Sequence, residues 1–278
     1  MSTVPCLPQG PGIPCDFTRD YEFARLPLMR ELERSVLGCD YGGTSWTTRR
    51  QADRLAKWLG LAPDRRLLEL GAGCGWPALY LARVSGCELV MTDIPTLGLR
   101  IAAERAGLEQ TAPQCMAVAA DGVALPFRDA AFDRISHSDV LCCMADKLAM
   151  LRECRRVARP EGRLAFAVID MPRNLSPAEV DIAVRAGPPF VDAPADYDTL
   201  LRQAGWESIR CIDASEDFRQ SLRVSLEQVE AQEEALTAAL GADEYTERRR
   251  RKGAALSAVE ARVLRREWFV ALPAVEST

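Results

Sequence analysis

The chain has 278 residues, of which 48% are hydrophobic, 27% charged and 6% aromatic. This composition is ordinary for a globular protein and excludes a collagen-like, low-complexity or wholly disordered chain. The 35 Lys and Arg residues against 40 Asp and Glu give a formal charge of -5, which disfavours a general nucleic-acid binder.

Targeting signals and cysteines are the next constraint. Charged or breaker residues interrupt every apolar run before it reaches the roughly 18 residues of a membrane span, so no membrane partner is expected. Residues 1–17 are rich in Pro and Gly and lack the basic and apolar parts of a secretory signal, which predicts a flexible arm on a cytoplasmic protein. The ten cysteines contain no CxxC pair, so reduced thiols and no metal site are expected.

The periodicity predicts helices first and then an α/β domain. Helical patterns over 20–37 and 48–59, separated by the glycine-containing segment 41–46, predict an N-terminal helical cap over residues 18–60. Short apolar runs then alternate with helical segments, as in a mainly parallel sheet. The predicted strands are 66–70, 87–93, 114–121, 132–137, 162–170 and 207–213. The predicted helices are 76–84, 95–106, 147–158 and 197–204.

The end of the chain departs from this alternation. Residues 215–266 are mostly helical and heavily charged, and they precede a last predicted strand at 266–273. If that strand returns to the sheet, the helices are an insertion rather than a separate domain. The predicted organisation is therefore a single domain over 61–278 with a helical insertion at 215–266.

The segment LLELGAGCGWPALYLA (67–82) reads as a strand, a glycine-rich turn and a helix. Gly71, Gly73 and Gly75 allow a tight turn and let backbone N–H groups approach a ligand beside the helix N-terminus. A nicotinamide dinucleotide fold is one rival, but its fingerprint is GxGxxG, and Trp76 stands where its third glycine would be. The spacing here is GxGxG, which opposes that rival.

An acid follows the glycines at a diagnostic distance. Asp93 ends the second predicted strand about twenty residues further on, where a carboxylate can accept both hydroxyls of a ribose. The alternative is that Asp93 caps the following helix. Its position after a glycine loop favours the ribose.

Five segments in order now carry a resemblance: ELGAGCG (69–75), MTDIP around Asp93, ADGVALPF (120–127), FDRISHSDVL (132–141) and LRECRRVARPEGRLAF (151–166). Together they resemble the class I S-adenosylmethionine-dependent methyltransferases, most closely the small-molecule quinone, sarcosine and phosphoethanolamine types. The resemblance implies a Rossmann-like, doubly wound, mainly parallel seven-stranded sheet whose last strand is antiparallel. It also implies S-adenosyl-L-methionine as cofactor and S-adenosyl-L-homocysteine as product.

Carried over by position, the resemblance also assigns site residues. It places Glu69, Gly71, Ala72, Gly73 and Gly75 around the methionine part, and Asp93 and Ile94 at the ribose and adenine. Asp121, with Gly122 beside it, would accept from the adenine amino group, although Asp-Gly is also a common turn former. His137 and Ser138 would lie close to the sulfonium. Tyr41 and Trp46, in the predicted cap, would contact the cofactor, with ordinary core packing as the alternative.

Methyl transfer from a sulfonium is a displacement in which positioning supplies most of the catalysis. A hydroxyl or ammonium acceptor also needs a base, and His137, the single histidine in the chain, is the first candidate. Asp139 is the second: it could take the proton, orient the histidine or cap a helix. Cys74, Cys142 and Cys143 raise the alternative of a soft ligand, but buried cysteines normally behave as small hydrophobes.

These observations predict a methyltransferase acting on a small-molecule acceptor, with no nucleic-acid partner. The acceptor atom can be oxygen, nitrogen or carbon, and the oligomeric state is open. Two alternatives remain: a protein that binds the cofactor as a regulator or scaffold without turnover, and a nucleotide-dependent oxidoreductase.

Overall fold

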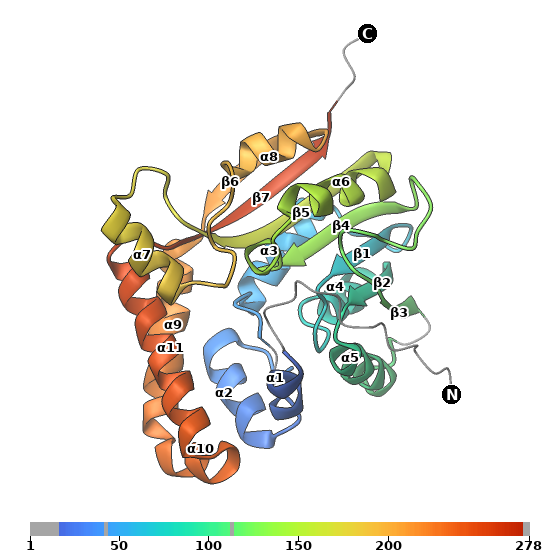
Figure 1. The fold of residues 1–278 in the computed structure, drawn as a ribbon. Coiled ribbons are helices and arrows are strands. Elements are labelled where there is room, and N and C mark those ends of the chain that lie inside the picture. Colours follow the sequence, from blue (N-terminus) through green and yellow to red (C-terminus); the bar gives the residue numbers. More distant parts are fainter. Residues whose placement is uncertain (1–16, 42–43, 112–113, 275–278) are drawn as a thin grey trace.

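The structure, a computed structural model, describes residues 17–41, 44–111 and 114–274, so nearly all of the predicted arm lies outside the described residues. The described residues form one seven-stranded sheet (Figure 1). Its strands are β1 (Arg66–Leu70), β2 (Glu88–Asp93), β3 (Cys115–Ala119), β4 (Phe132–Ser138), β5 (Ala158–Asp170), β6 (Trp206–Asp213) and β7 (Arg265–Pro273). In space they follow the order β3-β2-β1-β4-β5-β7-β6.

The direction of the strands confirms the predicted fold class. β1 pairs with β2 and β4, β2 with β3, and β4 with β5, all in parallel. β7 is antiparallel to both β5 and β6 and inserts between them. The last strand therefore returns to the sheet, as the sequence predicted, and the carboxyl ends of β1 to β4 share one edge.

Helices cover both faces of the sheet, because its strands are apolar on both sides. Leu151 of α6 shares a buried cluster with Phe166 on one face, and Leu55 of α3 and Leu99 of α5 share another with Leu67 on the opposite face. Fully burying one such side chain stabilises the fold by about 1.5–3 kcal/mol. The flanking helices are α3 (Arg49–Leu59), α4 (Ala78–Ser85), α5 (Thr96–Leu108), α6 (Lys147–Val157) and α8 (Tyr197–Gln203).

The N-terminal helical region differs from the prediction in one respect. Residues 20–37 were expected to form one helix, but the structure has two, α1 (Thr18–Phe23) and α2 (Pro27–Leu37). Pro27 stands in the first turn of α2 after the extended residue Leu26. A proline has no N–H to continue a preceding helix and disfavours a helical residue before it, so the break is local in origin.

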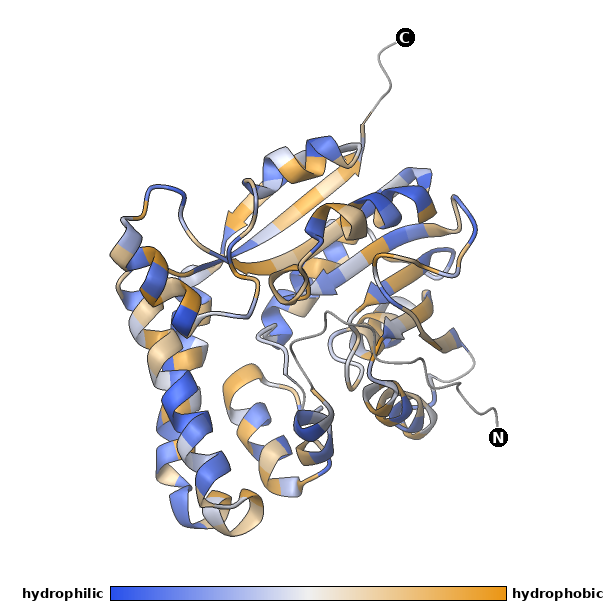
Figure 2. Cartoon of the chain, in the orientation of Figure 1, coloured by the Kyte–Doolittle hydropathy of each residue, from blue (hydrophilic) through white to orange (hydrophobic). Residues whose placement is uncertain are grey.

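Three helices lie between β6 and β7: α9 (Ser215–Ala231), α10 (Glu233–Leu240) and α11 (Ala242–Glu260). Figure 2 shows the middle of α11 as hydrophilic, in contrast to the largely hydrophobic β7. Leu32 of α2 shares a small buried cluster with Val229 of α9 and Leu236 of α10, so the N-terminal helices pack against this insertion. A further helix, α7 (Pro177–Ala186), was not predicted; it begins with a capping box between Ser176 and Glu179.

Candidate functional site

The glycine loop after β1 makes the tight turn that the sequence predicted. Gly71 has φ +63, and a Cβ there would lie 2.4 Å from a methyl carbon of Val140. Gly75 has φ +98, and a Cβ there would lie 2.6 Å from Leu79. Left-handed backbone and close packing thus both require glycine. The buried Ala72 donates its N–H to the carbonyl of Thr92 at 3.0 Å, which holds the loop against the end of β2.

Asp93, at the carboxyl end of β2, is tied directly to this loop. Its Oδ2 accepts the Gly73 N–H at 2.8 Å, and its Oδ1 accepts the N–H of Ile94 at 2.7 Å. The hydroxyl of Tyr21 in α1 also donates to Oδ2, at 3.3 Å. Burial raises the pKa of Asp93 to about 6, although these donors favour the carboxylate.

Asp121 lies in the turn after β3, one residue past a backbone contact with Asp93. The Ala120 N–H donates to the Asp93 carbonyl at 3.1 Å, which joins the two strand ends. The Asp121 carboxylate accepts the Val123 N–H at 3.1 Å, so the predicted turn forms. A Cβ on Gly122 would lie 3.3 Å from the sulfur of Met150, so this turn packs closely against α6.

Glu69 is buried in β1, two residues before Gly71. It accepts a hydrogen bond from the hydroxyl of Ser136 on the neighbouring strand β4. Burial raises the pKa of Glu69 to about 8, and the Ser136 contact opposes that rise only partly. A buried carboxylate with one hydrogen-bond donor is stabilised by a further donor or by a cation, and an ammonium group is both.

His137 and Ser138 end β4 beside β1, as the predicted strand end required. The His137 ring is fully buried and stacks on Phe166 with centroids 4.7 Å apart. Within the described residues neither of its nitrogens has a hydrogen-bond partner, and the same holds for the Ser138 hydroxyl. Burial lowers the pKa of His137 to about 3, so the imidazole is neutral at physiological pH.

Asp139 follows with a left-handed backbone, φ +59, that few residues other than glycine adopt. Its two carboxylate oxygens accept from Nε and an NH2 group of Arg266, each at 2.9 Å. Among the described residues no hydrogen bond joins this carboxylate to a His137 nitrogen, so the structure does not support the predicted orienting role. Arg266 also engages both of the oxygens that a general base would use. The short 3₁₀ turn that follows has Val140 at its N-cap, so Asp139 does not cap it.

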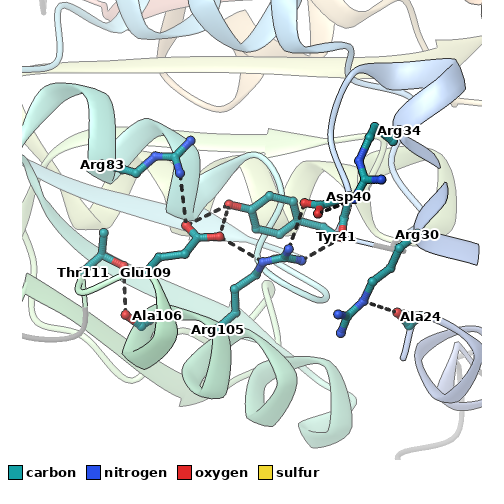
Figure 3. A network of polar contacts seen from close by, with 10 residues as sticks. All are labelled: Ala24, Arg30, Arg34, Asp40, Tyr41, Arg83, Arg105, Ala106, Glu109 and Thr111. Carbon is teal, nitrogen blue, oxygen red and sulfur yellow. Dashed lines mark hydrogen bonds and ion pairs between the residues drawn. The ribbon is translucent and has the colours of Figure 1, made fainter. Parts of the chain in front are cut away.

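Tyr41 has contacts other than those predicted (Figure 3). Its hydroxyl donates to Glu109 at 3.0 Å, the Arg105 guanidinium lies 3.8 Å over its ring, and Trp76 packs against it with centroids 5.2 Å apart. Only 4% of Tyr41 is exposed. Its ring and hydroxyl are both engaged by protein, which favours the core-packing alternative, and its contact with the cofactor stays a prediction.

Trp46 lies where the N-terminal region meets the insertion. Its ring meets Phe218 of α9 edge-on at 5.2 Å between centroids, and the ammonium of Lys252 in α11 lies 5.0 Å from its centre. These contacts place it between two helical elements and leave its predicted cofactor contact untested.

Two residues at this edge escaped sequence reasoning. Tyr21 lies in a predicted helix and belongs to no recognised motif. Only the fold brings its ring to 3.4 Å from where a Cβ on Gly73 would be. Arg266 stood at the junction of the predicted insertion and the last strand. Nothing in its sequence neighbours marks it as the partner of Asp139, which lies 127 positions away in the sequence.

The residues at the strand ends fit an adenosylated amino acid. The glycine loop over residues 71–75 forms a cradle at this edge, where Gly71 and Gly75 leave no room for a Cβ, and Asp93 is half-buried beside it. The unpartnered Ser138 and His137 are donor and acceptor groups whose burial is otherwise costly. The two acids with raised pKa values, Asp93 and Glu69, suit hydroxyl and ammonium donors.

Comparison with known proteins agrees with this geometry. Residues 68–166 match the model of the methyltransferase domain family. The chain is 33% identical over 194 residues to 27-O-demethylrifamycin SV methyltransferase of Amycolatopsis mediterranei, covering 68% of this chain and 71% of that protein. The chain belongs to the class I S-adenosylmethionine-dependent methyltransferases. It is also 33% identical to the O-methyltransferase cnsE of Penicillium expansum, covering 62% of this methyltransferase and 64% of that one.

Solved structures share the fold at lower identity. The phosphoethanolamine N-methyltransferase 2 of Haemonchus contortus, solved with S-adenosylhomocysteine, superposes with a TM-score of 0.75 and 18% identity over 88% of this chain and 57% of that one. The [4+2]-cyclase SpnF superposes with a TM-score of 0.70 and 21% identity over 96% of this methyltransferase and all of that chain. Among the described residues, no helix has both the length and the apolar character needed to cross a bilayer.

Proposed function

We propose that this methyltransferase transfers the methyl group of S-adenosylmethionine to an oxygen atom of a small-molecule acceptor. The observation that carries the proposal is the direct bond from the Gly73 N–H to Asp93, which joins the glycine loop to an acid suited to a ribose. The choice of oxygen is supported by the names of two relatives, the 27-O-demethylrifamycin SV methyltransferase and the O-methyltransferase cnsE.

The cofactor would be held in parts by residues from adjacent strand ends. Asp93 would bind the ribose and Ile94 would cover the adenine, while Asp121 would accept from the adenine amino group. Glu69 and the glycine loop would hold the methionine part. When bound, the cofactor supplies an electrophilic methyl group on a sulfonium.

The protein's own contribution would be to place the acceptor in line with that methyl group and to exclude water. We propose that His137 accepts a hydrogen bond from the acceptor hydroxyl, since both of its nitrogens lack partners within the described residues. Its low pKa keeps it in the neutral form that can receive a proton. The same low pKa makes it a weak base, so positioning should contribute more than proton transfer.

The test is transfer of a labelled methyl group from S-adenosylmethionine into a metabolite extract and into polyhydroxylated natural products. The expected result is labelled product with the methyl on oxygen, identified by mass spectrometry and NMR. Label on nitrogen or carbon would refute the choice of acceptor atom. Preferential binding of NADH over S-adenosylmethionine in a titration would contradict the cofactor and favour an oxidoreductase.

A second function is binding of the cofactor without methyl transfer. The fold is shared with a protein described as a cyclase, and a fold alone does not define a reaction. Tight binding of S-adenosylmethionine with no labelled product from any acceptor would favour this second function.

A further inference from the structure

Arg266 is a buried cation at the second position of β7. Its relative exposure is 0%, and its guanidinium makes four hydrogen bonds. Two go to Asp139, one to Gln51 Oε1 at 3.1 Å and one to Thr47 Oγ1 at 3.0 Å. The guanidinium also lies 5.3 Å from the ring centre of Trp268. One side chain thus links β7, the loop after β4 and the segment that enters α3.

The first link reaches one end of the glycine loop. Asp139 holds the loop after β4 in a left-handed conformation that is unfavourable for a residue with a Cβ. A methyl carbon of the next residue, Val140, lies 2.4 Å from where a Cβ on Gly71, the first glycine of the loop, would be. Arg266 thus binds the carboxylate of the residue that directly precedes Val140.

The second link reaches the other end of the same loop. The Thr47 side chain is bound to Arg266, and the Thr47 carbonyl accepts the indole N–H of Trp76 at 2.7 Å. Trp76 directly follows Gly75, the last glycine of the loop. Thr47 is itself fully buried, so its two hydrogen bonds are shielded from water.

A third link reaches the helical insertion. The Gln51 side-chain oxygen accepts from Arg266 and from the N–H of Thr48 in a capping box. Its amide nitrogen donates to Asp217 of α9 at 3.2 Å. The backbone of Arg266 also bonds to the start of α9, accepting the Ala214 N–H at 2.8 Å and donating to the hydroxyl of Ser215 at 3.1 Å.

We propose that Arg266 is a positioning residue that fixes both ends of the cofactor cradle and couples the cradle to the helical insertion. Arg266 acts through Asp139 and Thr47 on the residues that border the glycine loop. The proposal rests on the proposed function only in naming the cradle as the cofactor site. It assigns Asp139 to positioning instead of proton transfer.

Electrostatics support a positioning role over a simple stabilising one. Taking two charges out of water costs several kcal/mol per ion, so a buried pair stabilises a fold little compared with apolar residues. The network gains geometric precision, because a bidentate guanidinium fixes both the distance and the plane of the carboxylate. Lysine cannot reproduce this geometry, since its ammonium is a point donor on a flexible chain.

The test compares Arg266→Lys with Arg265→Lys, the adjacent residue on β7. Arg265 is a matched control because its guanidinium also pairs with a buried carboxylate, Asp170, at 3.1 Å, while its second ion pair, at 3.1 Å, is with Glu267 on its own strand. Both variants are first checked by circular dichroism. Their affinity for S-adenosylhomocysteine is then measured by calorimetry, and amide hydrogen exchange without ligand is measured over 44–48 and 138–141.

We expect Arg266→Lys to bind S-adenosylhomocysteine at least tenfold more weakly, with faster exchange in both segments. Arg265→Lys should stay within twofold of the unmodified protein. Equal effects of the two variants, or faster exchange in one segment alone, would overturn the proposal. The exchange measurement does not depend on any methyl transfer, so failure of the proposed function leaves it informative.

Asp139→Asn and Thr47→Val keep the proposal falsifiable if Arg266→Lys does not fold. Thr47→Val removes one hydroxyl and leaves the ion pair, so we expect faster exchange at 44–48 and at least threefold weaker binding. Asp139→Asn should lower turnover at least tenfold while the shape of the pH profile stays unchanged. A changed shape would identify Asp139 as the base, and unchanged binding in Thr47→Val would exclude coupling through Thr47.

Discussion

Asp93→Asn tests the centre of the site, because it removes charge and one acceptor oxygen while keeping the size of the side chain. The remaining amide oxygen can still accept the Gly73 N–H, so the loop should keep its shape, while the Ile94 N–H loses its acceptor. A hydrogen bond to a charged group contributes about 1.5–3 kcal/mol, which corresponds to a loss of about 10- to 150-fold in cofactor affinity. Calorimetric titration with S-adenosylmethionine measures this directly.

The stability of the same variant should change in the opposite direction. The folded protein raises the pKa of Asp93 from 3.8 to about 6, so it binds more protons than the unfolded chain between these values. Stability therefore falls as pH rises through this window, by at most about 3 kcal/mol and by less where water reaches the half-buried carboxyl. The asparagine cannot ionise, so Asp93→Asn should be no less stable at pH 7.

The pH dependence of binding supplies the decisive comparison. Ribose hydroxyls donate to the ionised carboxylate, so cofactor affinity in the unmodified protein should fall as pH decreases below about 6. Asp93→Asn should lack this dependence. The reasoning is refuted if affinity is unchanged in the variant, or if affinity and unfolding free energy fall together, which would indicate a damaged loop instead of a lost ligand contact.

Three further predictions concern residues around Asp93. His137→Phe keeps the stack on Phe166 but removes both nitrogens, so turnover should fall about 10- to 100-fold, with binding of S-adenosylhomocysteine unchanged. Burial lowers the pKa of His137 to about 3, so the unmodified protein loses stability as pH falls from 6.5 towards 3. His137→Phe should not show this loss in an acid denaturation experiment. Gly71→Ala should lower stability by about 2–4 kcal/mol through left-handed strain and the contact with Val140, whereas Gly253→Ala, in an open helical position, should not lower the melting temperature. Tyr21→Phe removes a donor that competes with ribose for Asp93, so cofactor affinity should rise about 2- to 10-fold, and a fall would show that the phenol contacts the cofactor instead.

The sequence predicted those parts of the fold that local pattern determines. All seven strands were predicted as segments from the sequence pattern, and the resemblance implied that the last one is antiparallel. The break at Pro27 was missed because the helical periodicity continues on both sides of it. α7 was missed because its buried face is nearly absent: Ala183 is its single buried residue among those described.

Some residues of the candidate site could likewise be predicted from the sequence and others could not. The glycine loop and Asp93 were singled out by motif and spacing and Asp121 by the resemblance, and the topology brings their strand ends to one edge. Their roles toward the cofactor stay predictions. Tyr41 was assigned to the cofactor by position, and nothing in the sequence indicated that its hydroxyl donates to Glu109. Arg266 could not be found, because its role depends on antiparallel insertion of β7 beside β5, which places it across from the loop after β4.

The buried ionisable groups at the strand ends share one physical cause. Burial raises the pKa values of Glu69 and Asp93 and lowers that of His137, so each group is pushed towards its neutral form. S-adenosylmethionine carries an ammonium and a sulfonium, and two such cations favour ionised carboxylates. They disfavour a protonated imidazole for the same reason. A site of this kind therefore stabilises the methyl donor most when His137 is neutral, which is the state in which it can accept a hydrogen bond from an acceptor hydroxyl.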